Sequence, residues 1–409
     1  MTVFSRRKLL GGIGLGGVAL GGVGLATAGC APAAARTSGA VPFQGAHQAG
    51  ISTDAQDRLA FAAFDVTSSE RADLVALLQT WTAAAEAMTR GAPVPGDSTS
   101  PEVPPADTGE AAGLPPSSLT VTIGFGPGLF DGRFGLAPHR PAALQPLPAL
   151  PREILDPTRT GGDIAIQACS DDPQVAFHAI RNLARLGRGT VVTRWTQLGF
   201  GRTSSTGSTQ ATPRNLMGFK DGTRNIKSDD AAALDQHVWV PDSTDQAWIR
   251  GGSYLVARRI RMFIEPWDRD RLGDQNAVFG RDKATGAPLT GTNELDAPDF
   301  AATDGEGNPV IAANAHIRLA AFENNNGLRI LRRGYSFTDG IDATTGTLDA
   351  GLFFISFQSD PAAFITLQRT LGTHDALNEY IRHTGSGLFA CPPGVTQAGD
   401  YWGRALVEA

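Results

Sequence analysis

The first half of the chain shows a succession of strand-like and helix-like patterns. Residues 59–66 form an apolar run without polar alternation, which predicts a buried strand. Thr67-Ser68-Ser69-Glu70 has the composition of a helix start, and a helix is expected over 69–88. The remaining elements are strands at 118–125, 163–169 and 190–198 and a helix at 173–186. The order strand, helix, strand, strand, helix, strand predicts a four-stranded antiparallel sheet with both helices on one face.

The second half repeats this order. It begins with a long strand over 254–264 and a helix over 266–279, followed by a Gly/Pro/Asn-rich insertion over 282–314. The later elements are strands at 328–337, 352–357 and 387–391, with helices from Pro361 and near 374–382. Asp-Pro helix caps occur at matching places in the two halves, which favours an internal duplication. We therefore predict an α+β protein with domains 41–230 and 231–409 and a ligand cleft between them.

Composition and charge narrow the classes of partner. The 409 residues are 41% hydrophobic and 19% charged, which is ordinary for a globular protein with a sizeable core. The formal net charge is -6, and the first 40 residues hold four basic residues and no acid. The rest of the chain is therefore more acidic than the whole, which argues against nucleic acid and anionic membrane surfaces as partners.

Residues 1–40 have the pattern of a targeting segment. Ser5-Arg6-Arg7-Lys8-Leu9-Leu10 precedes a weakly apolar, Gly-rich run, and the paired arginines favour a twin-arginine signal, which exports proteins that have already folded, often around a cofactor. A plain secretory signal is the alternative, whereas the glycines disfavour a retained membrane anchor. Cys30 follows small residues and is a candidate lipid-attachment site, although cleavage within 31–35 without lipidation fits equally. The expected location is extracellular or in the cell envelope.

The stretch 215–225 is the first candidate for chemistry. Asp221 lies between Gly218 and Gly222 in a segment with neither helical nor strand periodicity. Flanking glycines let the backbone turn sharply or approach a ligand closely, so they can present the carboxylate to a cavity. Asp-Gly is also the commonest hairpin-turn signal, and taken alone the stretch favours an ordinary turn.

Histidines and cysteines offer no local multi-ligand metal site. The seven histidines form no HxH or HExxH pair, and Cys169 and Cys391 lie in apolar runs typical of buried thiols. His316 stands between the long insertion and an apolar stretch, where it could project inward as a single axial ligand. A surface or satisfied core position remains the default for a lone histidine.

Arginines in two predicted strands carry further chemistry. Alternation over 254–264 places Arg258 among apolar neighbours, where a cation needs an anionic partner from the protein or from a ligand. Alternation also sends Arg332 and Arg333 to opposite faces, so only one of them can enter a shared cavity. A salt bridge at a sheet edge is the alternative for each arginine.

An inward histidine, a presented aspartate, arginines and a signal for folded export together suit a haem peroxidase. Here the chain resembles the dye-decolourising peroxidases, in their twin-arginine-exported branch, which includes proteins described as deferrochelatases. The most specific marker is Gly218-Phe219-Lys220-Asp221-Gly222, the G-x-x-D-G of that family. The resemblance covers nearly all of the chain from about Phe43, with supporting matches at 44–51, 286–291, 316–320 and 331–335.

The resemblance implies a fold, a cofactor and a set of roles. It implies two ferredoxin-like domains and one haem b per chain, held mainly by the second domain. His316 matches the proximal iron ligand, Asp221 the distal acid–base residue and Arg332, the first arginine of its pair, the distal arginine. Asp375 or Glu379 is expected to accept a hydrogen bond from His316. Residues expected to contact the cofactor are Arg258, Gly222 and Thr223.

The implied activity is reduction of hydrogen peroxide coupled to one-electron oxidation of dyes, phenols or other aromatic donors. The partners are hydrogen peroxide, the donor and the twin-arginine export machinery, and homo-oligomer formation is left open. Three other interpretations remain at this point. They are a deferrochelatase that takes iron from haem, a non-enzymatic haem-binding protein of the envelope, and a secreted binding module without haem.

Overall fold

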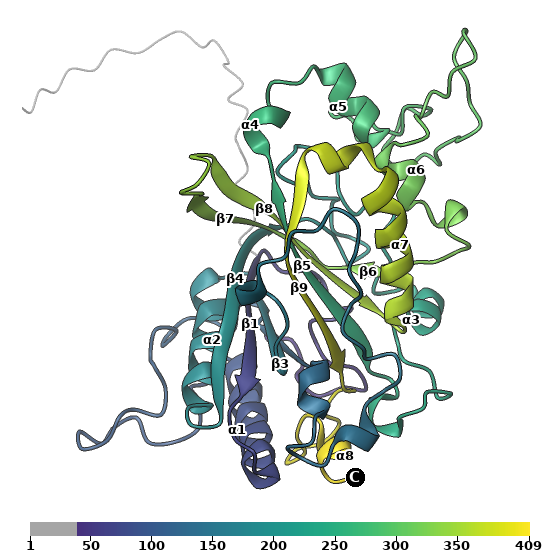
Figure 1. Ribbon diagram of the computed structural model, residues 1–409. Helices are drawn as coiled ribbons and strands as arrows, with labels where there is room; N and C mark the ends of the chain where they lie inside the picture. Colours follow the sequence, from purple (N-terminus) through teal and green to yellow (C-terminus); the bar gives the residue numbers. More distant parts are fainter. Residues whose placement is uncertain (1–38) are drawn as a thin grey trace, which may run out of the picture. The chain divides into compact units, whose positions relative to one another are not determined.

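The computed structural model describes residues 39–409, so the expected signal segment and Cys30 lie outside the described residues, apart from positions 39 and 40. Residues of this described part form a single unit by their contacts, and Figure 1 shows their sheet with helices on its outer faces. Strand and helix together confirm the α+β class. The boundary proposed near residue 230 stays a prediction.

The N-terminal half follows the predicted order of elements. Strand β1 (Arg58–Val66) leads into helix α1 (Arg71–Thr89), and β2 (Thr120–Phe125) and β3 (Ile164–Ser170) precede α2 (Pro173–Leu186) and β4 (Val191–Arg202). The strands lie side by side in the order β2, β3, β1, β4, all antiparallel. The carboxylate of Asp172 accepts hydrogen bonds from the backbone N–H groups of Gln174 and Val175, so the predicted helix cap is present.

The C-terminal half has the corresponding strand order, with interruptions. Its strands are β5 (Ser253–Met262), β6 (Leu331–Arg332), β7 (Tyr335–Ile341), β8 (Leu348–Gln358) and β9 (Ile381–Cys391), and α7 (Pro361–His374) crosses between β8 and β9. Strand β8 pairs with β5, which pairs with β9, while β6 and β7 follow one another along the other side of β8. The Asp360 carboxylate caps α7 at Ala362.

The two halves share one sheet, whereas the sequence predicted a four-stranded sheet for each half. Strand β4 pairs with β7 at Phe200 and Arg202, and β2 touches β9 through Phe125 and Ala390, so the described strands close into a barrel-like sheet. Edge strands of a small sheet carry unpaired N–H and C=O groups, and each half satisfies part of the edge of the other. The separating cleft expected between two domains is therefore replaced by a common interior.

This common interior explains the unbroken apolar run of β1. Leu59, Phe61 and Ala63 belong to the cluster of side chains inside the closed sheet, whereas Ala60 and Phe64 belong to the cluster under α1 and α2. The strand is buried on both faces and needs no polar alternation. Cys169 and Cys391 are buried free thiols, as predicted.

Several predicted elements are shorter or divided. The helix expected over 266–279 is two helices, α4 (Ile264–Trp267) and α5 (Leu272–Phe279), because Arg271 is extended between them. Helix 374–382 is a single 3₁₀ turn at Ala376–Glu379, since Asp375 is extended and caps it. Elements not predicted are α3 (Ala231–His237), α6 (His316–Ala320) and α8 (Arg404–Val407). No helix among residues 39–409 is long and apolar enough to span a membrane.

Candidate active site

A cavity of about 250 Å³ lies between helix α7 and the outer face of the C-terminal half of the sheet. Strand side chains that point to this outer face supply the apolar floor of the cavity, and α7 supplies a second apolar wall. These floor and wall residues are Ile260, Met262, Leu352, Phe354, Ile381, Phe364, Leu367 and Leu371. The 215–225 loop and α6 bring several of the polar side chains, Asp221 and His316 among them, to this largely apolar space.

The 215–225 loop presents Asp221 through a tight turn. Both Gly218 and Gly222 have a φ of 84°, which an L side chain rarely adopts. A Cβ on Gly222 would lie 3.0 Å from the Cα of Ser204, so Gly222 also permits a close backbone approach beside the cavity. Gly218 instead faces Lys283 and does not line the cavity. The turn and the presented carboxylate are thus two aspects of one structure.

Asp221 and Arg332 form an ion pair at the cavity. Arg332 Nη1 donates to Asp221 Oδ1 at 2.9 Å, and Asn215 Nδ2 donates to the other carboxylate oxygen at 3.2 Å. Arg333 points the opposite way and is fully buried, where it donates to the backbone carbonyls of Thr53 and Asp54. Alternation between Arg332, which ends β6, and the residue that follows it therefore places Arg332, and not Arg333, beside Asp221.

His316 is the first residue of α6 and is anchored by a buried carboxylate. Its Nδ1 lies 2.6 Å from Asp375 Oδ2, and the Asp375 side chain is 2% exposed. Burial alone lowers the pKa of His316, but the charge and hydrogen bond of Asp375 outweigh it, so that the pKa is raised. Of the two expected partners, Asp375 and Glu379, the structure selects Asp375.

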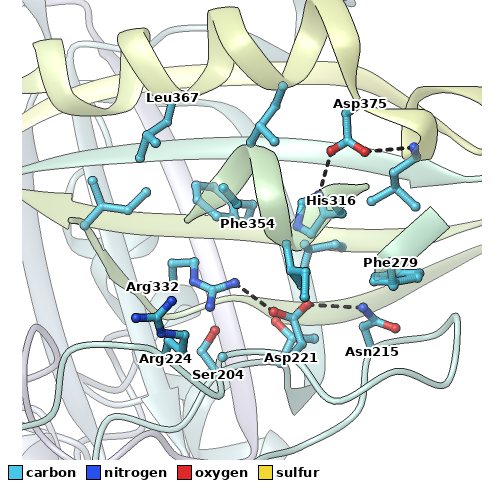
Figure 2. Close-up of a pocket in the computed structure, with 18 of the residues that line it drawn as sticks. Ser204, Asn215, Asp221, Arg224, Phe279, His316, Arg332, Phe354, Leu367 and Asp375 are labelled. Carbon is cyan, nitrogen blue, oxygen red and sulfur yellow. Dashed lines mark hydrogen bonds and ion pairs between the residues drawn. The ribbon is translucent and has the colours of Figure 1, made fainter. Parts of the chain in front are cut away.

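His316 and the Asp221–Arg332 pair face each other across the cavity. Figure 2 shows His316 and Asp375 along one wall and Asp221, Arg332, Asn215 and Ser204 along the opposite one. Elements far apart in sequence supply these walls, namely α6 with the end of α7 on one side and the 215–225 loop with β6 on the other. One ligand bound in the cavity can therefore contact an imidazole on one face and a carboxylate–guanidinium pair on the other.

Arg258 is not brought into this cavity. Its buried guanidinium donates to Glu153 Oε2 at 2.6 Å and to Ser386 Oγ at 2.8 Å, and its Nε lies 3.4 Å from His383 Nδ1. The anionic partner that alternation demanded comes from the protein, through Glu153. Arg258 can touch a bound group only indirectly, through His383, which does line the cavity.

Thr223 lines the cavity, yet its hydroxyl is engaged within the protein. Thr223 Oγ1 donates to Glu294 Oε1 at 3.1 Å, and Lys220 Nζ pairs with the other oxygen of Glu294 at 3.2 Å. Sequence reasoning missed Ser204, Asn215 and Gln368 as cavity residues. Asn215 alone had a local signal, because it opens the glycine-flanked stretch.

His383 makes a testable contribution to the pH dependence of stability. Burial, with Arg258 as a neighbouring cation, lowers the pKa of His383 to about 3. Below the ordinary pKa of 6.5, His383 binds a proton in the unfolded chain but stays neutral in the folded chain. As the pH falls from 6.5 to about 3, the free energy of unfolding therefore decreases by up to about 1.4 kcal/mol per pH unit. Urea unfolding at pH 6.5 and 4.5 should show a smaller loss for His383→Gln, and equal losses would contradict this role.

The residues of the cavity fit a haem group. The apolar floor and the α7 wall suit the apolar surface of a flat macrocycle, and no protein partner of His316 Nε2 is found in residues 39–409. The cationic side chains at the cavity outnumber its two carboxylates, and they suit the acidic edge of a haem group. These cationic residues are Lys220, Arg224, Arg281, Arg329 and Arg332. A single histidine is a common protein ligand of haem iron.

Comparisons with known proteins agree with this geometry. The family models described as Dyp-type peroxidase, N-terminal and C-terminal, match residues 48–201 and 212–396. A protein named deferrochelatase from Escherichia coli is 40% identical over 99% of this chain and 97% of its own length. A DyP-type peroxidase from Streptomyces coelicolor and ferric DtpA from Streptomyces lividans are each 41% identical with a TM-score of 0.83, over 91% of this chain and 98% of theirs.

Proposed function

The chain belongs to the Dyp-type peroxidase family and is a haem-dependent peroxidase, and we propose that it reduces hydrogen peroxide while oxidising dyes, phenols or other aromatic donors by one-electron steps. The observation that supports this most directly is the placement of the Asp221–Arg332 pair across one cavity from His316. A site that only stored a ligand would not need an acid–base group opposite the metal-ligand candidate.

The side chains have separate tasks in this reaction. Bound haem would supply the iron that exchanges electrons with peroxide and donor. Asp221 takes a proton from one peroxide oxygen and delivers it to the other, which leaves as water when the O–O bond breaks. The two electrons for this cleavage would come from bound haem, and two one-electron donors with two protons would restore them and release the first oxygen as a second water. Arg332 donates hydrogen bonds that position peroxide and stabilise the charge developing on the departing oxygen. His316 is the residue that would hold the iron, with Asp375 fixing its ring.

Asp375 tunes the histidine, and its loss has a graded effect. Replacing Asp375 with Asn removes the negative charge that orients the imidazole and makes it a stronger donor to a metal. We expect haem affinity or peroxidase kcat to fall about 10–100-fold. Haem titration of the purified variant measures the first quantity and donor oxidation the second. Glu379→Gln is the matched control, and an equal loss in that variant would contradict a specific role for Asp375.

A second candidate is release of iron from haem, because the relative that is 40% identical over 99% of the chain is named deferrochelatase. In that activity haem would be substrate, and Asp221 and Arg332 would act on it directly. Two measurements on the same preparation separate the candidates: peroxide-dependent turnover of an anthraquinone dye, and appearance of free iron with metal-free porphyrin after haem addition. Iron release without dye turnover would replace the first proposal with the second.

The identity of the cofactor and its binding contacts are part of the proposal. We infer haem b, one per chain, because no cysteine lies among the residues that line the cavity and the two cysteines of residues 39–409 are buried in strands. A non-covalent haem is then extracted intact by acidified organic solvent. Gly222 and Thr223 border the cofactor in this arrangement, and Arg258 acts through His383.

Export and organisation complete the proposal. Residues 1–40 would direct folded, cofactor-loaded protein through the twin-arginine route to the envelope or the exterior, with Cys30 as a candidate lipid-attachment residue and homo-oligomer formation open. Replacing Arg6 and Arg7 with Lys should retain the protein inside the cell. We also interpret each half as a ferredoxin-like unit, a description supported by the strand order on either side of the shared edges.

A further inference from the structure

Arg332 is held at the cavity from its backbone rather than by packing of its side chain. The side chain remains 29% exposed, and Asp221 is its hydrogen-bonding side-chain partner within residues 39–409. It belongs to β6, which comprises Leu331 and Arg332 alone and, in the described part of the chain, pairs only with β8. A two-residue edge strand fixes its own register weakly, so something else must determine where the guanidinium lies.

The outward side of β6 is occupied by one side-chain amide. Arg333 N donates to Ile355 O of β8 at 2.8 Å, so the N–H and C=O of Arg332 point away from β8 by strand alternation. Asn225 Oδ1 accepts from Arg332 N at 2.8 Å, and Asn225 Nδ2 donates to Arg332 O at 2.8 Å. The carboxamide thus makes the pair of bonds that the next strand of a sheet would make.

Asn225 is itself fixed within the loop that carries Asp221. Its backbone N–H donates to Gly222 O at 3.0 Å, and its Nδ2 also donates to Ser205 O at 3.2 Å. Asn225 is 5% exposed, so these bonds are shielded from competing water. Asp221 and the anchor of Arg332 are therefore parts of one five-residue segment.

From these contacts we infer that Asn225 is the positioning residue for Arg332: its carboxamide replaces the missing neighbour strand of β6 and registers the guanidinium against Asp221. The inference rests on the proposed catalytic role of Arg332. It assigns a specific task to the residue three places beyond the Gly222 of the glycine-flanked stretch, and Asn is suited to it because one planar group offers both a donor and an acceptor.

The first test measures peroxide reactivity. Asn225→Ala should lower kcat/KM for hydrogen peroxide by about 10–100-fold, because a displacement of about 1 Å in a catalytic group has an effect of this size. The haem content per chain and the KM for the donor should be unchanged. If the Ala variant fails to load haem, Asn225→Asp takes its place in the test. This substitution keeps the size and the acceptor but places a carboxylate oxygen against two carbonyls, so it should show a comparable loss.

A matched control separates positioning from general stability. Asn182 is likewise a buried amide, with three hydrogen bonds to Thr108 and to His178 O, but it joins α2 to the 91–117 loop and does not line the cavity. Asn182→Ala should lower the thermal midpoint about as much as Asn225→Ala and leave peroxide reactivity intact. Equal losses of reactivity in both variants would overturn the inference.

A double-mutant cycle tests whether Asn225 acts through Arg332. If it does, Asn225→Ala adds nothing to the loss already caused by Arg332→Ala, whereas two independent roles would multiply. Full multiplication overturns the inference and leaves the role of Arg332 standing. If Arg332→Ala itself keeps parental kcat/KM, the proposed function of Arg332 fails, which is a distinguishable result.

A measurement without turnover completes the design. Hydrogen exchange of the Arg332 backbone amide reports directly on the bond to Asn225 Oδ1, with or without haem. We expect exchange at residues 331–333 to become faster in Asn225→Ala and to stay parental in Asn182→Ala. Parental exchange of the Arg332 amide in Asn225→Ala would show that the carboxamide does not hold β6.

Discussion

Asn in place of Asp221 should lower kcat/KM for hydrogen peroxide by about 10²–10⁴-fold, the range typical of losing a positioned acid–base group. Asparagine keeps the size of the side chain and the hydrogen bond to Arg332, but it can neither take a proton from peroxide nor return one. The loss should appear in the peroxide step and be independent of the donor. Stopped-flow mixing with peroxide, followed in the haem absorbance band, measures that step directly.

The control for Asp221 asks whether the cofactor site survives. Haem stoichiometry and affinity should match the parent, because Asp221 lies on the wall opposite His316. Parental peroxide reactivity in Asp221→Asn would contradict the acid–base role. If the parent protein shows neither peroxidase activity nor iron release, and Asp221→Asn binds haem as tightly as the parent does, the result would instead favour a non-enzymatic haem-binding protein.

His316→Ala is expected to abolish peroxidase activity and to weaken haem binding by more than about 100-fold. Loss of a second-layer partner such as Asp375 costs about 10–100-fold, and loss of the ligand itself should cost more. The absorbance spectrum of haem added to the purified variant should lose the features of histidine ligation. Free imidazole can enter the space left by the side chain, so its addition should partly restore the parental spectrum.

The matched control for this variant is His139→Ala, since His139 is distant in sequence from both walls and does not line the cavity. It should keep parental haem binding and activity. A preparation of the parent with no absorbance near 400 nm after haem supplementation would contradict every role assigned to His316 here, and would favour a binding module without haem.

The sequence was sufficient for local structure wherever one pattern dominated. The buried strand at β1, the Asp172 and Asp360 caps and the alternation of Arg332 with Arg333 were all predictable, because each depends on residues within one element. Prediction failed where distant groups decide, as at the break between α4 and α5 and in the helix expected over 374–382, where Asp375 is extended and contacts His316.

Arg258 illustrates the same limit. Alternation indicated that a buried cation needs an anion, and it left open whether a ligand or the protein supplies it. Glu153 lies in an irregular, proline-rich segment with no periodicity that could have placed it beside β5. The choice was settled only by the path of that segment over the sheet.

What the sequence by itself determined is therefore the order of elements, the faces of the strands and the chemical character of Asp221, His316 and Arg332. The tertiary structure decided that β2 meets β9 and β4 meets β7, that Asp375 holds His316 and that Asn225 holds Arg332. The physical reason is that propensity and periodicity act over a few residues. The hydrogen bond between Asn225 and Arg332 joins residues 107 positions apart, which no local pattern can specify.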